Sequence, residues 1–385
     1  MMINHNKKLK VLHVLGGLWC GGTEAFVMNM YRSIDREKVQ FVFLIHEKSK
    51  AHYDDEVLSL GGIIYRIPDR TEVGTIKYMI YLIRILFKIK PDVIHAHAMF
   101  NSGVVMLASF ITGIKKRVCH SHNTADQFGD SISRNIFRTI MRLCIRGFST
   151  DLAACGNEAA LYLFGDKILK EGKAHVLKNA VNVEMYKFNG AIRSKVRDEL
   201  NAGNRLVLGH IGRFSKEKNH EFLVYVFKAV HKLHPDSLLV LIGDGEFRPR
   251  IEKKVADLEL SGAVKFLGIR NDVSKLMQGM DLFVFPSLFE GFPFVLVEAQ
   301  AAGLNCIISD TITPDTNITQ RLNFLSLKDS PAIWAKKILS SSYKHEDTLE
   351  IIRSKGYDNV TMAKWLTDFY MGHKHEQNLV IRGGF

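Results

Sequence analysis

The stretch that most constrains the fold is Asp281–Gly303, which reads DLFVFPSLFEGFPFVLVEAQAAG. It opens with four consecutive apolar residues, Leu282–Phe285, and Pro286 ends this run. A short, uninterrupted apolar run is typical of a strand buried on both faces of a parallel sheet. Pro293 can begin a helix after the loop, because proline lacks the N–H that would be unpaired in the first turn, and Gly303 can end that helix. The stretch therefore predicts a strand–loop–helix unit of an α/β protein.

Two glutamates flank the start of this helix, Glu290 in the loop and Glu298 inside the helix. The first N–H groups of a helix, here those of Gly291, Phe292 and Phe294, lack partners within the helix and attract anions. Glu298 is unusual because its helix is otherwise apolar on almost every side, and a buried carboxylate needs donors such as ligand hydroxyls. The alternative is a charge that interacts only with the helix dipole, an effect that fades after the first turn. We therefore favour a ligand site at this turn.

The length and composition indicate a globular protein of two domains. One hydrophobic core rarely serves 385 residues. Five scattered cysteines without a C-x-x-C pair favour a reducing cytoplasm over a disulfide framework or a cysteine-rich zinc site. The polar start leads straight into a strand, so we expect no signal peptide, and no uncharged apolar run reaches the roughly 18 residues of a transmembrane helix. Most of the net charge of +12 lies in residues 1–185, which suggests an anionic partner there: a lipid surface, a phosphorylated substrate or nucleic acid.

The first half alternates strands with helices. At its start Val11–Leu15 leads into the glycine-rich turn of residues 16–24 and a helix over Ala25–Ser33, an order typical of a Rossmann-like domain. The turn is not G-x-G-x-x-G, and no acidic residue closes a second strand to bind a ribose, so a dinucleotide site is not predicted. Gly21 and Gly22 either let the backbone approach a ligand, which we favour, or form a plain strand-to-helix turn. The further strands that we expect in this half are Phe41–Ile45, Gly62–Ile67, Val93–Ala96, Arg117–His120 and Leu152–Ala154.

Two helices in this half are basic and amphipathic. Residues 75–90 mix lysines and an arginine with large apolar residues, and residues 134–148 carry an arginine at every fourth position. The arginines of this row are Arg134, Arg138, Arg142 and Arg146. Such helices suit the surface of an anionic membrane, or they are packed helices with a solvated face. The two interpretations are equally supported for residues 75–90, whereas for the arginine row we favour a lipid or lipid-phosphate role.

Histidines occur in pairs at the ends of two expected strands, His95 and His97 in DVIHAHAMF and His120 and His122 in RVCHSHNT. The members of an i, i+2 pair face the same side of a strand, and the carboxyl ends of parallel strands border the ligand crevice of open α/β sheets. We expect His97 and His122 to line that crevice, and His95 and His120 to serve in the core or in hydrogen bonds. Zinc is disfavoured, because no carboxylate or third ligand accompanies the pairs at metal spacing.

A polar, charged segment over Asn179–Asn204 marks the expected domain boundary, and the second half repeats the strand–helix order. Its expected strands are Leu206–His210, Ser237–Ile242, Val264–Phe266, Leu282–Phe285 and Asn305–Ile308. Arg213 and Lys218 leave the end of the first of these strands together. An arginine fork with a lysine point charge is a common pair for a diphosphate, and the position before a helix favours this role over plain surface charges. The turn Gly243–Gly245 lets backbone pass close to the same crevice.

Four segments of the second half, in their order and spacing, resemble the carboxyl-terminal half of the retaining glycosyltransferases of family 4: GRFSKEKN, LIGDGE, VKFLGIRNDV and FPSLFEGFPFVLVEAQAAG. In the first half, LHVLGGLWCGGTEAFVMN, DVIHAHAMF and RVCHSHNT resemble the branch that builds bacterial capsular polysaccharides and exopolysaccharides. The resemblance covers residues 9 to 340. It implies the α/β fold called GT-B, in which two Rossmann-like domains face each other across a cleft and a final helix near Thr361–Met371 crosses back to the first domain. The expected domains are residues 1–185 for the acceptor, residues 186–360 for the nucleotide sugar, and residues 361–385 for the crossing helix and tail.

The resemblance also implies roles for single residues. On the donor side, Arg213 and Lys218 would hold the diphosphate, Glu298 the ribose hydroxyls, and Glu290 would lie by the donor sugar. The remaining donor contacts would come from Gly291, Phe292 and Pro293 along the sugar and phosphate, Ile269 and Arg270 at the base, and Gly21 and Gly22 from the other domain. His122 would contact the sugar or the acceptor, and His97 would lie on the acceptor side. The residues expected to act in catalysis are Glu290, His122, Arg213 and Lys218. Lys178-Asn179-Ala180 stands where the family has a Pro-Asn-Gly turn, which leaves the geometry of the hinge open.

The implied chemistry needs no metal and no cofactor other than the nucleotide-sugar substrate, for which UDP is the favoured nucleotide. Negative charge develops on the leaving phosphate, where Arg213, Lys218 and a helix N-terminus can stabilise it, and the chain holds no D-x-D sequence for a divalent ion. Retention would follow from attack on the same face, with a donor phosphate oxygen taking the acceptor proton. Glu290 would either stabilise the oxocarbenium-like centre or orient sugar hydroxyls.

The expected acceptor is a glycan linked to polyprenyl diphosphate, and the expected location is cytoplasmic, peripheral on the inner face of the cell membrane. A non-hydrolysing nucleotide-sugar 2-epimerase shares the fold, but it would not need a basic, apolar acceptor face. A nucleic-acid-binding protein would explain the net charge, yet the sequence shows no aromatic–basic interleaving or known module, so nucleic acid is not an expected partner. The absence of the dinucleotide-binding sequence G-x-G-x-x-G disfavours an NAD-dependent enzyme.

Overall fold

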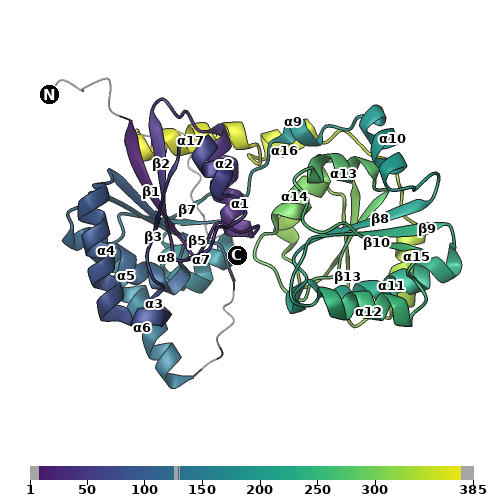
Figure 1. Cartoon of the computed structure of the whole chain (residues 1–385), viewed down its shortest axis with the longest axis horizontal. Coiled ribbons are helices and arrows are strands. Elements are labelled where there is room, and N and C mark those ends of the chain that lie inside the picture. Colours follow the sequence, from purple (N-terminus) through teal and green to yellow (C-terminus); the bar gives the residue numbers. More distant parts are fainter. Residues whose placement is uncertain (1–7, 125–128, 130, 374–385) are drawn as a thin grey trace. The chain divides into compact units, whose positions relative to one another are not determined.

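The computed structural model describes residues 8–124, 129 and 131–373. These residues form two compact units (Figure 1). Unit 1 takes the chain up to Ala180 and again from Asn359, and unit 2 takes Val181–Asp358. The boundaries expected from the sequence, at residues 185 and 360, lie a few residues beyond these positions. Residues 374–385 of the expected tail are outside the described part of the chain.

Unit 1 is built on a seven-stranded parallel sheet in the order β3-β2-β1-β4-β5-β6-β7. Its strands are β1 (Leu9–Leu15), β2 (Val39–Ile45), β3 (Ile63–Arg66), β4 (Val93–Ala96), β5 (Lys116–Ser121), β6 (Asp151–Ala154) and β7 (Ala174–Val176). Its helices are α1 (Gly22–Ser33), α2 (Asp54–Ser59), α3 (Arg70–Val73), α4 (Thr75–Ile89), η1 (Met99–Asn101), α5 (Ser102–Ile111), α6 (Ile132–Phe148), α7 (Asn157–Phe164), α8 (Asp166–Lys170) and α17 (Asn359–Met371). Figure 1 shows α1 and α17 together on one face of the sheet, and α4, α5 and α6 on the other.

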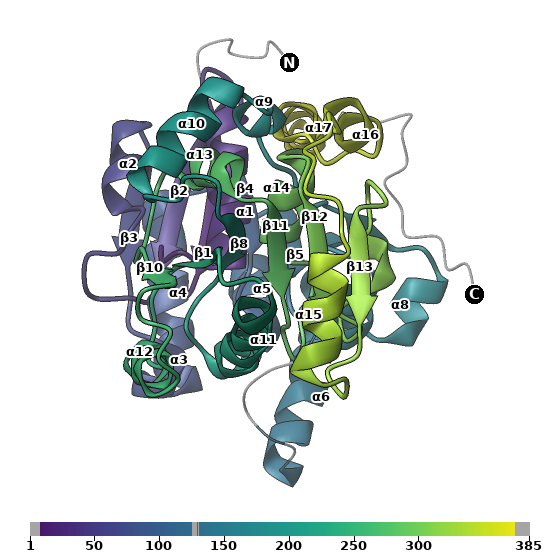
Figure 2. The ribbon, with the colours of Figure 1, turned by 90° about the vertical axis from the view of Figure 1, so that its right-hand side faces the viewer.

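Unit 2 is built on a six-stranded parallel sheet in the order β10-β9-β8-β11-β12-β13 (Figure 2). Its strands are β8 (Leu206–Ile211), β9 (Ser237–Ile242), β10 (Val264–Phe266), β11 (Leu282–Phe285), β12 (Asn305–Ser309) and β13 (Leu322–Leu325). Its helices are α9 (Val183–Tyr186), α10 (Gly190–Glu199), η2 (Lys216–Lys218), α11 (His220–Leu233), α12 (Arg248–Asp257), α13 (Val273–Gly279), α14 (Phe294–Ala301), η3 (Pro314–Thr316), α15 (Pro331–Leu339) and α16 (Leu349–Ser354). The core packs α11, α12 and α15 against the sheet through residues such as Phe227, Val255 and Trp334.

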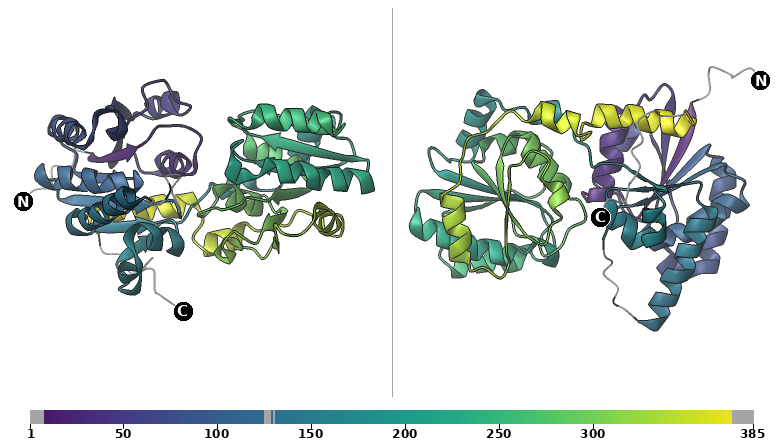
Figure 3. Two further views of the ribbon diagram at one scale, coloured as in Figure 1. Left: turned by 90° about the horizontal axis from the view of Figure 1, so that it is seen from below. Right: turned by 180° about the vertical axis from the view of Figure 1, so that it is seen from behind.

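The C-terminal helix α17 returns to unit 1, as the sequence predicts (Figure 3). The hydroxyl of Tyr370 lies 2.6 Å from Nδ1 of His95 on β4. Lys116 on β5 donates from Nζ to the carbonyl oxygen of Phe369 at 2.5 Å, and its ammonium lies 3.9 Å from the centre of the Phe369 ring. These contacts join α17 to the centre of the unit 1 sheet, so the chain crosses between the units twice.

All eleven strands that the sequence predicts are present, with ends shifted by no more than a few residues. Two short strands, β7 and β13, were not predicted. β7 has three residues, and β13 reads LNFL, which interrupts its apolar run with an asparagine. The segment Asn179–Asn204, expected to mark the domain boundary, contains the division between the units after Ala180, and its helices α9 and α10 pack on unit 2.

Two arginines of the row on α6 have structural partners that the sequence did not reveal, and the predicted lipid or lipid-phosphate role of the row stays a prediction. Arg142 donates to the carbonyl oxygens of Tyr162 and Leu163, and Arg146 donates to that of Phe164. These are the last carbonyl groups of α7, which have no partner within their own helix. Large apolar side chains are also exposed along α6: Ile132, Ile136, Ile140 and Leu143. Two of the four arginines are therefore committed to capping α7.

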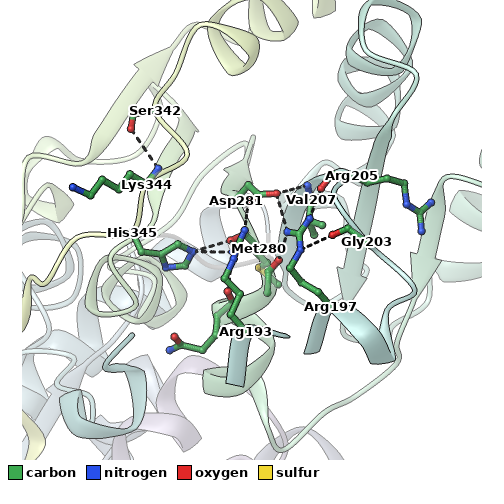
Figure 4. Close-up of polar contacts among 12 residues, drawn as sticks. Arg193, Arg197, Gly203, Arg205, Val207, Met280, Asp281, Ser342, Lys344 and His345 are labelled. Atoms are coloured by element: carbon green, nitrogen blue, oxygen red, sulfur yellow. Dashed lines mark hydrogen bonds and ion pairs between the residues drawn. The ribbon is translucent and has the colours of Figure 1, made fainter. Parts of the chain in front are cut away.

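A buried ion-pair cluster fastens α10 to the amino ends of β8 and β11 (Figure 4). The carboxylate of Asp281 pairs with Arg193 and lies 3.1 Å from Nη1 of Arg197, and it accepts a 2.7 Å hydrogen bond from the backbone N–H of Val207. Both arginines also donate to backbone carbonyl groups, Arg193 to Met280 and Arg197 to Gly279. The side chain of Asp281 is only 9% exposed, so the two arginines depend on it for their counter-charge.

We predict that Asp281→Ala destabilises unit 2 by about 3–5 kcal/mol, because removing one partner of a buried pair leaves the others uncompensated. Urea unfolding followed by circular dichroism measures the shift. Glu350→Ala is the matched control, since it removes an exposed partner of Arg353, and it should change the midpoint little. Equal midpoints for the two variants would contradict a stabilising role of the cluster.

Candidate active site

An ion pair joins two loops at the carboxyl ends of β8 and β11, which are neighbours in the sheet of unit 2. Nζ of Lys218 lies 2.5 Å from Oε1 of Glu290, and the hydroxyl of Ser287 donates to the same oxygen at 2.8 Å. The Lys218 and Glu290 side chains are 17% and 13% exposed. Ser287 was not predicted from the sequence, where its only signal is its position between the buried strand and Glu290.

The loop after β11 is held in place on both sides. The backbone N–H of Leu288 donates to the carbonyl oxygen of Glu217 at 2.8 Å, and the side-chain amide of Asn219 donates to that of Pro286 at 3.1 Å. On the other side, the hydroxyls of Ser309 and Thr311 both donate to the carbonyl oxygen of Ser287. This loop is therefore fixed by hydrogen bonds before any ligand arrives, as a binding site requires.

The groups around the ion pair suit an anionic ligand. Arg213 is exposed, and its side chain makes no hydrogen bond or ion pair with the residues that the structure describes. Helix α14 begins at Phe294, and Pro293 supplies no side-chain cap to its first N–H groups. Glu298 lies in the second turn of this helix and is half-buried, whereas Phe292 and Pro293 are buried, so the latter two offer mainly backbone. The residues predicted to bind phosphate and ribose thus lie on two adjacent loops and one helix.

The glycines of the turn Gly243–Gly245 allow it to pack against the Arg213 loop. A Cβ on Gly243 would lie 2.1 Å from the carbonyl oxygen of Gly212, and one on Gly245 would lie 2.6 Å from that of Phe214. Gly243 has a φ of 130°, a backbone conformation that residues with a Cβ atom rarely adopt. The backbone N–H of Phe214 donates to the carbonyl oxygen of Asp244 at 2.9 Å. The turn therefore supports the segment that carries Arg213.

Ile269 and Arg270 follow β10 at the same end of the sheet. Ile269 is 55% exposed. The guanidinium of Arg270 forms two 2.7 Å hydrogen bonds with the carboxylate of Asp272, which raise its pKa, and it also pairs with Glu199. Because the guanidinium of Arg270 is already engaged, we expect any contact of this residue with a base to come from its backbone. The predicted role of both residues stays a prediction.

Two buried histidines, on the strand before Lys218 and on the helix after it, were not predicted. Nδ1 of His210 on β8 lies 2.9 Å from the carbonyl oxygen of Val284, so this nitrogen carries the proton. His220 begins α11, stacks on Phe214 with ring centres 4.1 Å apart, and has no hydrogen-bond partner for either nitrogen within the described chain. Burial lowers the pKa of His210 to about 4 and that of His220 to about 2. Both rings are therefore neutral and add no positive charge to the site.

In unit 1, the turn between β1 and α1 is open. Gly21 stands before α1 in an extended conformation, and Gly22 is exposed with no atom within 4 Å of where its Cβ would lie. The N-terminus of α1 has no side-chain cap. These features are those of a loop whose backbone a ligand can approach, but the predicted contact of both glycines with a diphosphate stays a prediction.

Five histidines from three neighbouring strands meet on the face of the unit 1 sheet covered by α1 and α17: His13, His95, His97, His120 and His122. Two strings of hydrogen bonds connect them. His13 Nδ1 lies 3.1 Å from His97 Nε2, and His97 Nδ1 lies 2.8 Å from His122 Nε2. In the other string, His95 Nε2 lies 3.2 Å from His120 Nδ1. Only His122 is half-buried; the other four are buried.

This arrangement corrects the prediction for His97. We expected it to line the crevice, but it is only 6% exposed, because Phe26 of α1 covers it and it lies behind His122. His13 was also not predicted, because it is a single histidine in an apolar strand. Its strand β1 pairs with β4, so that His13 lies opposite His95. Burial lowers the pKa of His13 and His122 to about 3 and holds the pKa of the other three well below its usual value. All five rings are therefore neutral.

The histidine cluster also supplies the third ligand that sequence analysis did not find for a metal. One nitrogen each of His13, His95 and His97 lie within 4.8 Å of one another, and so do those of His97, His120 and His122. In this structure several of these nitrogens are instead paired with one another, which requires a proton between each pair. A metal ion would have to displace these hydrogen bonds.

A cavity of about 600 Å³ also opens beside the Asp281 cluster of unit 2, lined by Arg193, Arg197 and Arg205. The three guanidinium groups already donate to Asp281 or to backbone carbonyl groups. The cavity lies at the amino ends of β8 and β11, whereas open α/β sheets bind ligands beyond the carboxyl ends. We therefore assign it a structural role.

We predict that Gly243→Ala weakens the affinity for a nucleoside diphosphate about tenfold or more, because the new Cβ displaces the Gly212 carbonyl and with it the Arg213 loop. Isothermal titration calorimetry measures the affinity. Gly262→Ala is the matched control, since nothing lies within 4 Å of its added Cβ. Full affinity in the Gly243 variant would show that the 212–214 segment is not part of the binding site.

Comparisons with known proteins cover nearly the whole chain. The sequence model "Glycosyltransferase Family 4" matches residues 20–185, and "Glycosyl transferases group 1" matches residues 192–344. EpsF of Bacillus subtilis (strain 168), provisionally assigned as a glycosyltransferase, is 37% identical over 366 residues, which cover 92% of this chain and 94% of EpsF. CapH of Staphylococcus aureus, a capsular polysaccharide biosynthesis glycosyltransferase, is 25% identical over 94% of this chain and 99% of its own.

Two further comparisons bear on substrate and fold. The UDP-Gal:alpha-D-GlcNAc-diphosphoundecaprenol alpha-1,3-galactosyltransferase of Escherichia coli is 25% identical over 80% of this chain and 81% of its own length. The crystal structure of Anabaena HepE in complex with UDP-glucose aligns with a TM-score of 0.77, at 18% identity, over 94% of this chain and 100% of HepE. Both units, the returning helix α17 and these matches agree on one fold, GT-B. The chain therefore belongs to glycosyltransferase family 4, within its branch of capsular polysaccharide and exopolysaccharide glycosyltransferases.

Proposed function

We propose that this glycosyltransferase moves a hexose from a UDP-sugar to a glycan linked to polyprenyl diphosphate, with retention of the anomeric configuration and without a metal ion. The observation that carries the proposal is that Arg213, the Lys218–Glu290 pair and the uncapped N-terminus of α14 all lie on the segments that follow the neighbouring strands β8 and β11 of unit 2. Two basic side chains and a helix N-terminus are what a diphosphate needs. The E. coli relative supports the lipid-linked acceptor, and HepE supports a UDP-sugar donor.

The proposed mechanism uses these groups for charge stabilisation. The acceptor hydroxyl attacks the anomeric carbon on the face from which UDP leaves, the bond from that carbon to the phosphate oxygen breaks, and the acceptor proton passes to a phosphate oxygen. Arg213 and Lys218 stabilise the negative charge that develops on the diphosphate. Glu290 holds Lys218 in place and faces the donor sugar, while Glu298 accepts hydrogen bonds from the ribose hydroxyls. No acidic residue is needed to hold a divalent ion.

The test is a transfer assay with a panel of UDP-sugars, a lipid-diphosphate glycan and EDTA, with the anomeric configuration of the product read by NMR. We expect an α-linked product from an α-linked donor in EDTA, and a loss of turnover of about 10²–10³ in Arg213→Ala. Lys216→Ala, an exposed neighbour in the same segment, is the control and should stay near full activity. A β-linked product would contradict retention, loss of activity in EDTA would contradict metal independence, and conversion of a UDP-sugar without an acceptor would indicate an epimerase.

Substitutions of Glu290 and Glu298 should affect different kinetic constants. We predict that Glu298→Gln raises KM for the donor and leaves kcat within a few-fold, because it acts on the ribose alone. Glu290→Gln should lower kcat about 10²-fold with little change in KM, because the amide can still accept from Lys218 and Ser287 but no longer carries charge toward the sugar. Steady-state assays over a range of donor concentrations decide the matter; equal effects on both constants would contradict this division of roles.

We also propose that unit 1 docks on an anionic membrane surface through α4 and α6. Along α4, exposed Ile76, Ile80 and Phe87 form one stripe. Beside it lies a second, basic stripe of Lys77, Arg84 and Lys88, which are also exposed. Helix α6 adds its exposed row of isoleucines. Adjacent apolar and basic stripes suit a helix lying in a lipid interface. None of the described helices is both long and apolar enough to cross a bilayer.

The double variant Ile76→Asn/Ile136→Asn should lower the fraction of protein that floats with phosphatidylglycerol vesicles, because each change removes exposed apolar surface from one helix. Leu233→Asn, at an exposed apolar position of unit 2, is the control and should float like the native protein. Flotation should weaken in high salt, since the basic stripe contributes through screened charges. Native-like flotation of the double variant would rule out this docking face.

A further inference from the structure

The string His13–His97–His122 links a buried end of the unit 1 core to a ring that solvent reaches. His13 is fully buried, His97 is 6% exposed, and His122 is half-buried. Nδ1 of His122 makes no hydrogen bond with any residue in the described ranges, and this atom is not buried. The accessible end of the string is therefore Nδ1 of His122, where a ligand can bind.

The protonation of the three rings is coupled. Each neutral imidazole carries one N–H and one bare nitrogen, so each ring-to-ring hydrogen bond has one donor and one acceptor. With all three rings neutral, only two arrangements keep both hydrogen bonds. In one, protons point outward, from His13 to His97 to His122, and His122 carries its proton on Nδ1. In the other, protons point inward, His122 presents a bare Nδ1, and the last proton lies on Nε2 of His13.

The buried end decides between these arrangements. Nε2 of His13 is buried and has no hydrogen-bond partner in the described chain, and the ring is surrounded by Phe41 and Phe43. The inward arrangement would bury there an N–H that no described residue accepts, whereas the outward arrangement leaves a bare nitrogen. Orphaned buried N–H groups are rarer in proteins than acceptors without a donor. The outward arrangement is therefore favoured.

We propose that His97 is a positioning residue that holds His122 in the tautomer with its proton on Nδ1, so that His122 offers an N–H donor to the bound substrate and does not act as a base. The proposal deepens the proposed function, because it takes His122 as a contact of the sugar or the acceptor. It agrees with a mechanism in which the acceptor proton passes to a phosphate oxygen, since the protein then needs a donor that orients an oxygen atom. The second string, which starts at Tyr370, makes no hydrogen bond to His122 and plays no part in this choice.

The direct test is ¹⁵N NMR of the full-length protein with ¹⁵N-labelled histidine, without substrate, in which long-range couplings show which ring nitrogen is protonated. The His122 signals are assigned by their loss in His122→Gln. We expect His122 to be neutral with its proton on Nδ1 from pH 6 to 8. A proton on Nε2 in the native protein would overturn the proposal. Because no substrate is present, this result does not depend on whether the proposed function is right.

Variants of His97 test the positioning role. His97→Leu removes the donor, so His122 should shift to the Nε2-protonated form and kcat/KM should fall about tenfold, the effect of one neutral hydrogen bond. His97→Asn should restore much of both, because its amide can donate from about the place of Nδ1. His46→Leu, which removes a buried histidine bonded to Tyr78 elsewhere in unit 1, controls for general damage and should leave His122 unchanged. An unchanged His122 tautomer in His97→Leu would overturn the proposal.

A metal ion in the cluster is the remaining alternative that the experiments must separate. The native protein is dialysed with one equivalent of Zn²⁺ and then analysed for bound zinc. We expect no retained zinc, because the ring nitrogens of the string are engaged with one another. Retention of stoichiometric zinc that His97→Leu abolishes would overturn the proposal, since these nitrogens would then be metal ligands.

Discussion

The ion pair between Lys218 and Glu290 is the interaction on which the candidate active site depends. It joins residues 72 positions apart in the chain and exists because β8 and β11 are neighbours in a parallel sheet, whose carboxyl ends bring their loops together. With Ser287 it fixes the loop that leads into α14, while Arg213 in the segment after β8 is exposed. The loop follows the buried strand Leu282–Phe285, and the Asp281 cluster fixes the opposite, amino end of that strand.

Unit 1 contributes a different kind of chemistry. Its sheet gathers five neutral histidines where charged groups would be costly to bury, and it links them into hydrogen-bonded strings that end at His122 and at Tyr370 of the returning helix. A neutral cluster of this kind can orient a ligand, but it cannot supply the positive charge that a diphosphate needs. The candidate site residues of the two units thus differ in charge: those of unit 2 include charged side chains, and those of the histidine cluster in unit 1 are neutral hydrogen-bonding groups.

Much of the fold follows from the sequence because buried parallel strands read as short apolar runs. Val93–Ala96, Ser237–Ile242 and Leu282–Phe285 were predicted with the bounds that the structure has. The errors have physical causes. A regular row of arginines shows that one face of α6 is basic, but it does not show that Arg142 and Arg146 meet the open end of α7, because that contact depends on how the two helices pack. Likewise, the i, i+2 spacing of His95 and His97 places them on one face without showing that α1 covers it.

The central claim is that unit 2 binds a nucleoside diphosphate without a metal ion, and calorimetric titration of the protein with UDP, GDP and NAD in the presence of EDTA tests it most directly. We predict that UDP binds in EDTA with an affinity unchanged by added Mg²⁺, and that NAD does not bind. A preference for GDP would keep the site and change the donor. No binding of either diphosphate would contradict the account, because Arg213, Lys218 and the N-terminus of α14 would then not form the site proposed for them.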